Sequence, residues 1–294
     1  MEIDTTNGFS NLGNTCFMNS ALQMLIHCRD LTRLLSVYES KDKIVRMYQN
    51  LLLIYGNQNG KVLNPISIRQ ALGVTHKKYI MGSQEDSHEF IIHLLDELEE
   101  AIKKEDERIS NLISKLFDCN IETVISSVEC NQRSTKTEPV RFLSVPVAEG
   151  SYVTLNDCFE KFVEPEYMSD EWEAPDGNRY KANKITNIIK FPRNLIFQLK
   201  RYRYMRGGKK IDQDVDIPLK WTAPTGEVFD LRGFVLQSGG FSFGHYTYYG
   251  KVEDNWYMFN DSTVRQIDIM NIMTVAKSAY LICYRKRNQT KTNQ

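Results

Sequence analysis

The sequence predicts an α+β fold in which helices come first and strands follow. Up to about residue 115, apolar residues recur at intervals of three and four positions. From about residue 117, short segments rich in β-branched and aromatic residues are separated by turn residues. The sequence shows no internal repeat and no regular alternation of strand and helix, so it does not favour a parallel βαβ sheet.

Several stretches of the first part have helical spacing. Thr15 is the expected N-cap of the first helix, in which apolar positions continue from Phe17 to Cys28. The longest helix is expected from about Gln84 past Ile102. Three further helices are expected over Leu31–Tyr38, Lys43–Tyr55 and Ile66–Leu72.

Seven segments of the second part are expected to be strands. They span Asn120–Val128, Arg141–Val147, Asn194–Tyr202, Phe229–Gln237, Tyr246–Val252, Trp256–Asn260 and Ala279–Tyr284. The stretch Glu164–Asn183 contains two prolines and a glycine, and we expect a loop-like excursion there. Residues 288–294 are expected to form a frayed polar tail.

Composition and charge narrow the class of protein. Lys+Arg and Asp+Glu both number 37, so net charge offers no bulk attraction to nucleic acid or to a membrane surface. The polar, acidic N-terminus is unlike a secretory signal, and no apolar run approaches the roughly 18 residues of a membrane span. The six cysteines include no CxxC pair. We therefore expect a soluble protein with reduced thiols, in the cytoplasm or nucleus.

Cys16 is the first candidate for chemistry. It follows Gly13, Asn14 and Thr15, a turn that places it at the first position of the expected helix. Backbone N–H groups and the helix dipole there favour an anion, so we expect a thiol pKa below the free value of about 8.5. The same N–H groups can stabilise an oxyanion. A buried cysteine acting as a small apolar side chain is the alternative, and local context does not decide between them.

Two histidines are candidates for the base that activates this thiol. His27 lies eleven residues along the same helix, which at a rise of about 1.5 Å per residue places it beyond hydrogen-bond reach. His245 follows a glycine-containing run at 238–244, and a turn near 253–255 folds the next strand back. In that hairpin Asn260 or Asp261 is delivered beside His245. An ordinary surface hairpin with an incidental histidine is the alternative.

One acidic segment contains an apparent metal motif. His88-Glu89 followed by His93 resembles the zinc-protease pattern, but the histidines are five positions apart, so their rings point about 140° apart on a helix and cannot share an ion. Asp86 and Glu89 do share a face near the helix N-terminus. A helix cap formed by Ser83 and Asp86 is one interpretation. A clamp for a basic peptide is the other.

Four segments together resemble the ubiquitin-specific protease family of deubiquitinating enzymes. They are Asn11–Gln23 (NLGNTCFMNSALQ), similar to the cysteine box of that family, Gln84–Phe90, similar to its Q-x-D-x-x-E-F segment, Leu195–Tyr202 (LIFQLKRY), and Gly244–Ser262, similar to its histidine box. Their order matches the family over about residues 8–287, which is nearly the whole chain.

The resemblance implies a catalytic role for five residues. It makes Cys16 the nucleophile and His245 the general base. Asn260 becomes the residue that orients the histidine, and Asp261 assists it or shares that role. Asn11 takes the place of a side-chain donor to the oxyanion, a group whose removal typically costs about 10²–10³ in rate.

The resemblance also implies a binding site for the ubiquitin C-terminal tail. Asp86 and Glu89 would pair with the arginines of that tail. Gln84, Gly244 and Tyr246, which belong to the same matching segments, are assigned to substrate binding. The glycines near position 240 would flank a narrow passage for the final glycines of ubiquitin.

The architecture implied by the family is a papain-like cysteine protease fold within a single catalytic domain. It consists of a helical thumb at about 1–115, β fingers at about 117–190, and a β palm that makes up the remainder to 287. Many members hold a structural zinc in the fingers with two CxxC pairs. Here Arg133 stands where the partner of Cys130 should be, and no second pair lies near 170–185. We therefore expect no metal and no other cofactor.

The implied activity is thiol-dependent hydrolysis of the bond after the C-terminal glycine of ubiquitin. The expected partners are ubiquitin and ubiquitinated proteins, in a eukaryotic cell or host, and the enzyme is expected to be a monomer. Two alternatives are a protease for another ubiquitin-like modifier and a catalytically silent ubiquitin-binding domain.

Overall fold

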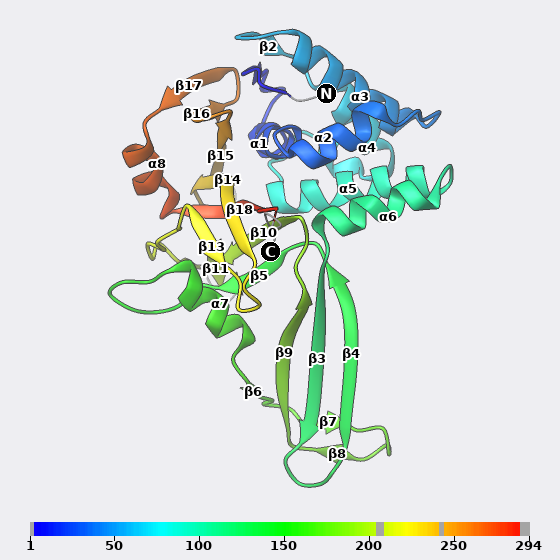
Figure 1. The fold of residues 1–294 in the computed structure, drawn as a ribbon, viewed down its shortest axis with the longest axis vertical. Helices are drawn as coiled ribbons and strands as arrows, with labels where there is room; N and C mark the ends of the chain where they lie inside the picture. The colour runs from blue at the N-terminus through cyan, green and yellow to red at the C-terminus, as the bar shows by residue number, and fades with distance from the viewer. Residues whose placement is uncertain (1–2, 204–208, 241–243, 289–294) are drawn as a thin grey trace, which may run out of the picture.

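A computed structural model describes residues 3–203, 209–240 and 244–288 of the chain. Residues 289–294, within the expected polar tail, and residues 241–243, within the glycine-containing run, lie outside the described residues. The described chain begins with helices and continues mainly with strands (Figure 1), which confirms the predicted α+β class.

The N-terminal part is a group of helices around one central helix. The central helix, α1 (Cys16–Ile26), is buried along its whole length and contacts α5 (Ser87–Lys103). Its polar Gln23 is satisfied inside the core, where Nε2 donates to Asn7 O at 2.6 Å and Tyr55 OH donates to Oε1 at 2.7 Å. The elements around it are β1 (Gly8–Phe9), α2 (Arg29–Val37), α3 (Lys43–Asn57), β2 (Val62–Leu63), α4 (Ile66–Thr75), the 3₁₀ helix η1 (Lys77–Ile80) and α6 (Glu107–Phe117).

Helix α5 begins at Ser87, three residues later than predicted, because Asp86 caps it. Asp86 Oδ1 accepts from His88 N at 2.7 Å and from Glu89 N at 3.2 Å. The predicted contribution of Ser83 to this cap is wrong, since its hydroxyl donates to Glu85 instead. Helix α6 was not distinguished in the sequence.

An eight-stranded sheet lies against the helices, with strand order β17-β16-β15-β14-β18-β10-β5 and β13 paired with β14. The β5–β10 pair is parallel, and the other pairs are antiparallel. The strands are β5 (Leu143–Pro146), β10 (Asn194–Lys200), β13 (Lys220–Thr222), β14 (Val228–Gly239), β15 (Gly244–Val252), β16 (Asn255–Asn260), β17 (Thr263–Ile267) and β18 (Ala279–Lys286). Helix α8 (Ile269–Ala276) joins β17 to β18, and β11 (Tyr202–Arg203) pairs with β12 (Lys209–Lys210).

The large sheet buries apolar side chains on both of its faces. Along β18, Leu281 and Cys283 join the core shared with the helices, whereas Ile282 and Tyr284 join a second core on the opposite face. This alternation is the two-residue period of a strand. Because α1 contacts β14, β15 and β16, the helical part is packed directly onto the sheet.

A second sheet projects away from the body, downward in Figure 1. Its strands are antiparallel in the order β4-β3-β9-β6. They are β3 (Cys119–Ser127), β4 (Arg133–Val140), β6 (Glu166–Tyr167) and β9 (Ala182–Lys190), with the short pair β7 (Trp172–Glu173) and β8 (Arg179–Tyr180) nearby. Within the range 117–190 expected for the fingers, β5 and α7 (Leu155–Val163) depart from that expectation. β5 pairs with β10 in the large sheet, and α7 contacts β5.

One arginine joins the base of this projecting sheet to the helices. Arg141, which follows β4, lies 3.1 Å from Asp96 of α5 and 3.3 Å from Asp118, which precedes β3. It also pairs with Glu99 of α5. The guanidinium is mostly buried, so these charges hold strand and helix together across a partly desolvated junction.

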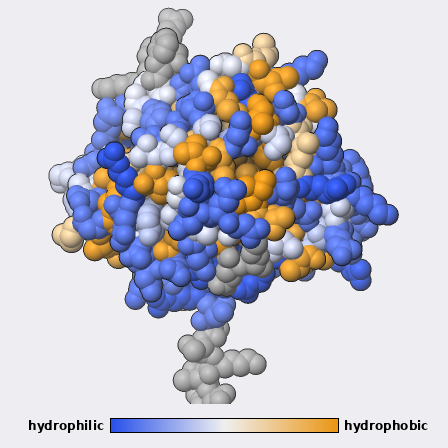
Figure 2. Space-filling model, turned by 90° about the horizontal axis from the view of Figure 1, so that it is seen from above, coloured by the Kyte–Doolittle hydropathy of each residue, from blue (hydrophilic) through white to orange (hydrophobic). Residues whose placement is uncertain are grey.

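Within the described ranges, none of the helices is long and apolar enough to cross a membrane. Figure 2 shows that on the upper face apolar patches are interspersed with hydrophilic side chains. The large apolar side chains exposed on the described chain include Leu53 of α3 and Val62 of β2.

Candidate active site

A turn delivers Cys16 to the first position of α1, as predicted. Gly13 and Asn14 adopt positive φ angles of 89° and 52°, and the helix begins at Cys16. Thr15 occupies the N-cap position, but its hydroxyl accepts from Leu12 N at 2.8 Å and caps none of the helix N–H groups. The first amides of α1 therefore stay available to a negative charge at the sulfur.

The thiol pKa differs from the sequence expectation. Burial raises the pKa of Cys16 above its ordinary value, and the nearby Asp261 carboxylate adds to the rise. The backbone N–H groups of Tyr246, Phe17 and Cys16 act in the opposite direction. The prediction of a lowered pKa is therefore wrong for this state of the protein, because the side chain is only 3% exposed and desolvation disfavours the thiolate.

The hairpin of β15 and β16 brings His245 to Asn260. The ladder pairs Val252 with Asn255 and Tyr248 with Phe259, and the His245 ring Nε2 lies 2.6 Å from Asn260 Oδ1. Because an amide oxygen is an acceptor, Nε2 carries the proton and Nδ1 keeps its lone pair.

Asp261 faces other partners than His245. Its Oδ2 accepts from Asn11 Nδ2 at 2.8 Å, and its Oδ1 accepts from Asn19 Nδ2 at 2.8 Å. Its backbone has a φ of 49°, and its carbonyl accepts from Phe9 N at 2.8 Å. Both carboxylate oxygens are therefore engaged by amides, and the contact with the histidine belongs to Asn260.

Asn11 is fixed by both ends of its amide. Its Oδ1 accepts from Gly13 N at 3.0 Å and Thr15 N at 3.2 Å, while Nδ2 donates to Asp261. An amide nitrogen has two hydrogens, so one remains for a further acceptor beside the start of α1.

The two halves of the site meet at Cys16. Gln84 Nε2 lies 3.8 Å from the Cys16 sulfur and also donates to Gly244 O. The N–H of Tyr246 is directed at the same sulfur. The thiol therefore lies beside the strand position next to His245, although more than two hundred residues separate the two in the chain.

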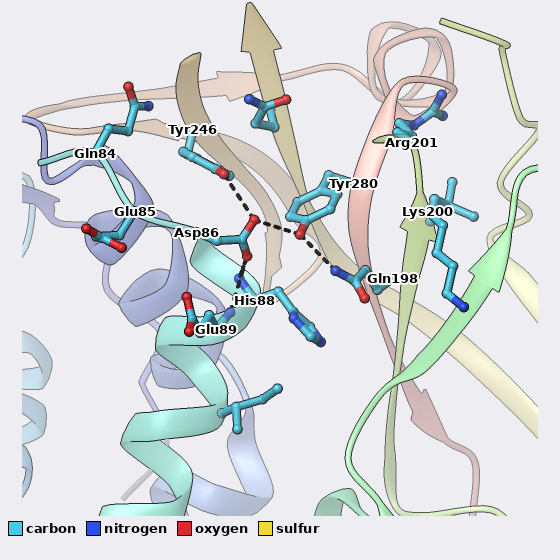
Figure 3. A pocket seen from close by; sticks show the side chains of 13 residues that line it. Gln84, Glu85, Asp86, His88, Glu89, Gln198, Lys200, Arg201, Tyr246 and Tyr280 are labelled. Carbon is cyan, nitrogen blue, oxygen red and sulfur yellow. Dashed lines mark hydrogen bonds between the residues drawn. The ribbon is translucent and has the colours of Figure 1, made fainter. Parts of the chain in front are cut away.

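A groove of about 740 Å³ leads away from this point, between α5 and the large sheet. Gln84, Asp86, Glu89 and Tyr246, four of the five predicted binding residues, line it. Asp86 lies at its centre (Figure 3), where Oδ2 accepts from Tyr280 OH at 2.8 Å and from Tyr246 OH at 3.3 Å. Gly244, the fifth predicted residue, takes part through its carbonyl bond with Gln84.

The acidic pair is already engaged by the protein itself. Asp86 uses one oxygen to cap α5 and the other to bind two tyrosines. Glu89 pairs with Lys78 of η1, whose ammonium also lies 3.8 Å from Glu85. Of the two, Glu89 has the more accessible carboxylate, with 47% of its side chain exposed.

Three contributors were not predicted from the sequence. Asn19 is buried one turn along α1 and holds Asp261. Tyr280 of β18 binds Asp86, and Gln198 of β10 donates to Tyr280 OH at 2.8 Å (Figure 3). Asn19 and Gln198 lie inside segments that matched the family, so their positions were visible, but their partners come from distant strands.

The projecting sheet does not offer the ligands of a four-thiolate zinc site. Cys130 is exposed in the turn that follows β3, whereas Cys119 is buried at the opposite end of that strand and Cys158 is buried in α7. Arg133 begins β4, and Trp172 and Ala174 stand in the region of the second pair. In the described ranges, no group of three or more His, Cys, Asp or Glu side chains could hold a metal ion.

Comparisons with known proteins agree on one family. A family model described as ubiquitin carboxyl-terminal hydrolase matches residues 7–284. Ubiquitin carboxyl-terminal hydrolase Usp2 of Drosophila melanogaster is 26% identical, over 95% of this chain and 34% of its own. Ubiquitin carboxyl-terminal hydrolase 42 of Homo sapiens is 25% identical, over 97% of this chain and 23% of its own length. The probable ubiquitin carboxyl-terminal hydrolase 4 of Schizosaccharomyces pombe is 26% identical, over 95% of this chain and 58% of its own length. This chain thus spans from about a quarter to three-fifths of the length of these relatives.

Solved structures agree on the fold. The SAGA DUB module of Ubp8, Sgf11, Sus1 and Sgf73 bound to monoubiquitin matches with a TM-score of 0.83 and 24% identity, over 98% of this chain and 71% of the matched chain. The same module bound to ubiquitin aldehyde matches with a TM-score of 0.80 and 23% identity, over 98% of this chain and 70% of the matched chain. At this identity the likeness shows the fold.

Proposed function

Because this chain belongs to the ubiquitin carboxyl-terminal hydrolase family, we propose that it is a cysteine-type deubiquitinase. It hydrolyses the isopeptide or peptide bond after the C-terminal glycine of ubiquitin, on protein conjugates or on ubiquitin chains. The observation that carries the proposal is the meeting of Cys16, at the start of a helix, with β15, which bears His245. The ring of His245 in turn contacts Asn260 of β16.

The proposed reaction begins with proton transfer from the Cys16 thiol to Nδ1 of His245, since Nε2 is bonded to Asn260. The sulfur attacks the carbonyl carbon of the terminal glycine, and the carbonyl oxygen becomes an oxyanion. Asn11 Nδ2 and the first N–H groups of α1 donate to that oxyanion. The imidazolium gives its proton to the lysine amine, which departs as the C–N bond breaks. The ubiquitin acyl group remains bound to Cys16 as a thioester. Water, deprotonated by His245, then hydrolyses the thioester and restores the thiol.

The 740 Å³ groove is the proposed path of the ubiquitin tail to the sulfur. Its wall formed by α5 carries Asp86 and Glu89, which suits a tail with basic side chains. Glu89 is the proposed direct partner of an arginine, after exchange of its contact with Lys78. Asp86 fixes the spacing between α5 and the sheet through its two tyrosine contacts. Gln84, Gly244 and Tyr246 surround the last residues of the tail next to the nucleophile.

The subdivision into parts is also a proposal. Residues 8–287 form a single catalytic domain, with the thumb at about 1–115, fingers drawn from 117–190, and the palm completed by β5 and α7 as well as the later strands. We place the protein in the cytoplasm or nucleus of a eukaryotic cell or host. Its six unpaired cysteines suit a reducing compartment.

The decisive experiment is labelling by ubiquitin that carries a C-terminal electrophile. The native protein is expected to form one covalent adduct, and Cys16→Ala none. Cys28→Ala, which removes another buried thiol, is the matched control and should label normally. No adduct with the native protein, or an undiminished adduct with Cys16→Ala, contradicts the proposal. Preferential labelling by a probe built on another ubiquitin-like modifier reassigns the substrate.

A further inference from the structure

Cationic side chains gather at the end of the large sheet that lies away from the groove. Strand β14 connects the two regions: Gly239 pairs with Gly244 at the groove end, and Arg232 lies seven residues earlier, roughly 24 Å away along an extended strand. A cavity of about 230 Å³ opens beside Arg232. The charged residues that line it are Arg193, Asp230, Arg232, Arg285, Lys286 and Arg287.

Most of these cations have a carboxylate partner. Arg285 binds Asp30 through two contacts of 2.8 Å, and Arg193 lies 3.4 Å from the same carboxylate. The other two pairs are Lys286 with Glu227 at 2.8 Å and Arg287 with Asp230 at 2.7 Å. Three carboxylates thus face five cations, which leaves an excess of about two positive charges around the cavity.

Arg232 is the cation without such a partner. In the part of the chain that the structure describes, its guanidinium forms no hydrogen bond or ion pair. Its position is unusual as well, because the β14–β18 register shifts between Leu231 and Gly233 and leaves Arg232 at the bulge. A bulge re-aims a side chain out of the regular alternation of a strand.

The surroundings of Arg232 are unfavourable for an isolated cation. Burial lowers its pKa from the ordinary value, and the charges of Arg29 and Arg285 lower it further. A guanidinium stays protonated even so. The positive charge is therefore held in a partly desolvated place next to like charges, where an anion would stabilise it.

We propose that this cavity is a binding site for a phosphoryl oxyanion, either inorganic phosphate or a phosphate monoester, with Arg232 as its central ligand. The planar fork of a guanidinium matches two phosphate oxygens, and such charge-assisted pairs are the strong class of hydrogen bond. A phosphate monoester carries about −1.5 to −2 charges at pH 7, which matches the local excess. The cavity has room for a tetrahedral anion, given roughly 30 Å³ for one water.

Isothermal titration calorimetry of the 294-residue chain tests the site, with inorganic phosphate in one arm and O-phosphoserine in the other. We expect saturable binding of one anion per chain, and at least about tenfold weaker binding by Arg232→Met, since a charge-assisted bidentate contact is lost. Arg232→Lys keeps the charge without the fork and should bind with intermediate affinity. Arg265→Met is the matched control, because this exposed arginine of β17 lies in the same sheet and outside the cavity lining. It should bind like the native protein.

Two results overturn the proposal. One is the absence of saturable binding by the native protein up to about 10 mM of either anion, an affinity too weak to matter. The other is equal binding by the native protein and Arg232→Met or, if that variant does not fold, by Arg232→Lys. Tighter binding of phosphoserine than of phosphate identifies a monoester as the ligand, and the reverse order identifies the free anion. Because the readout is binding, the result does not depend on deubiquitinase activity.

Discussion

The bond between His245 and Asn260 gives the sharpest prediction about catalysis. Asn260→Leu keeps the approximate size of the side chain and removes the acceptor that lies 2.6 Å from Nε2. The ring is neutral in the free enzyme of the proposed reaction and cationic after it takes the thiol proton. A hydrogen bond to a charged group contributes about 1.5–3 kcal/mol, so its loss should lower kcat by roughly 10- to 150-fold. KM should change little, because Asn260 is outside the lining of the groove.

The assay is steady-state cleavage of a fluorogenic C-terminal amide of ubiquitin, with kcat and KM measured separately across pH. Asn260→Asp retains an acceptor and should keep kcat within about threefold of the native value. Asp261→Asn should lower kcat, because Asp261 binds Asn11 and Asn19. It should also shift the thiol limb of the pH profile to lower pH, because the Asp261 carboxylate raises the pKa of Cys16. The reasoning is refuted if Asn260→Leu retains native kcat, or if its whole effect falls on KM.

Three further predictions test other parts of the structure. Lys78→Met should lower KM for ubiquitin substrates by up to about fivefold at low salt, because it removes the exposed ion pair that Glu89 must exchange for a substrate arginine, and such a pair is worth up to about 1 kcal/mol. At high salt the substitution should have no effect on KM, because the pair is then screened. An unchanged KM at low salt contradicts this prediction. His27 is buried with its pKa lowered to about 4, so the folded state binds fewer protons than the unfolded state as pH falls below about 6.5. Urea unfolding should therefore show up to about 3 kcal/mol of stability present at neutral pH and lost toward pH 4, with a weaker loss in His27→Phe; an equal pH slope in both proteins refutes this. Gly8→Ala would place a Cβ 2.6 Å from Ser262 O and 2.8 Å from Asp261 O, so we expect a loss of about 1–3 kcal/mol in thermal unfolding together with reduced kcat; native values for both quantities argue against a tight contact there.

The hairpin shows how far local reasoning carries. A glycine-containing run, a histidine and a turn nearby predict that Asn260 or Asp261 lies beside His245, and in the structure the contact is made by Asn260. The observed ladder centres between Glu253 and Asp254, about one residue from the centre implied by pairing 245 with 260. The sequence did not separate Asn260 from Asp261, because their difference depends on Asn11 and Asn19, which approach from the other end of the chain.

The pKa of the Cys16 thiol could not be predicted, because it depends on two opposing effects, the local helix start and the burial of the side chain in the fold. The position of Cys16 at a helix start is visible in the sequence and favours a thiolate. The depth of burial depends on how α1 packs against α5 and β15, which no local pattern reports. In this structure burial is the larger of the two effects.

The elements missed in the sequence have weak or misleading local patterns. Strand β4 is mostly exposed on both faces, so its residues lack the alternation that marks a half-buried strand. Strand β9 gains its order by pairing with β3. Helix α7 does have a readable local signal, a capping box formed by Thr154 and Asp157, but it lies within the range 117–190 that is expected to form the β fingers.

The junction at Arg141 has a consequence for the position of the far end of the projecting sheet. β3 leaves this anchoring point and runs for nine residues, roughly 30 Å at the usual rise of a strand. A tilt of only about 5° at its root would swing the far end by roughly 2.6 Å, over the length given by that rise. Since one guanidinium and three acidic side chains hold the root, a single charge change there would alter the position of the far end of the sheet, at a distance from every residue of the proposed catalytic site.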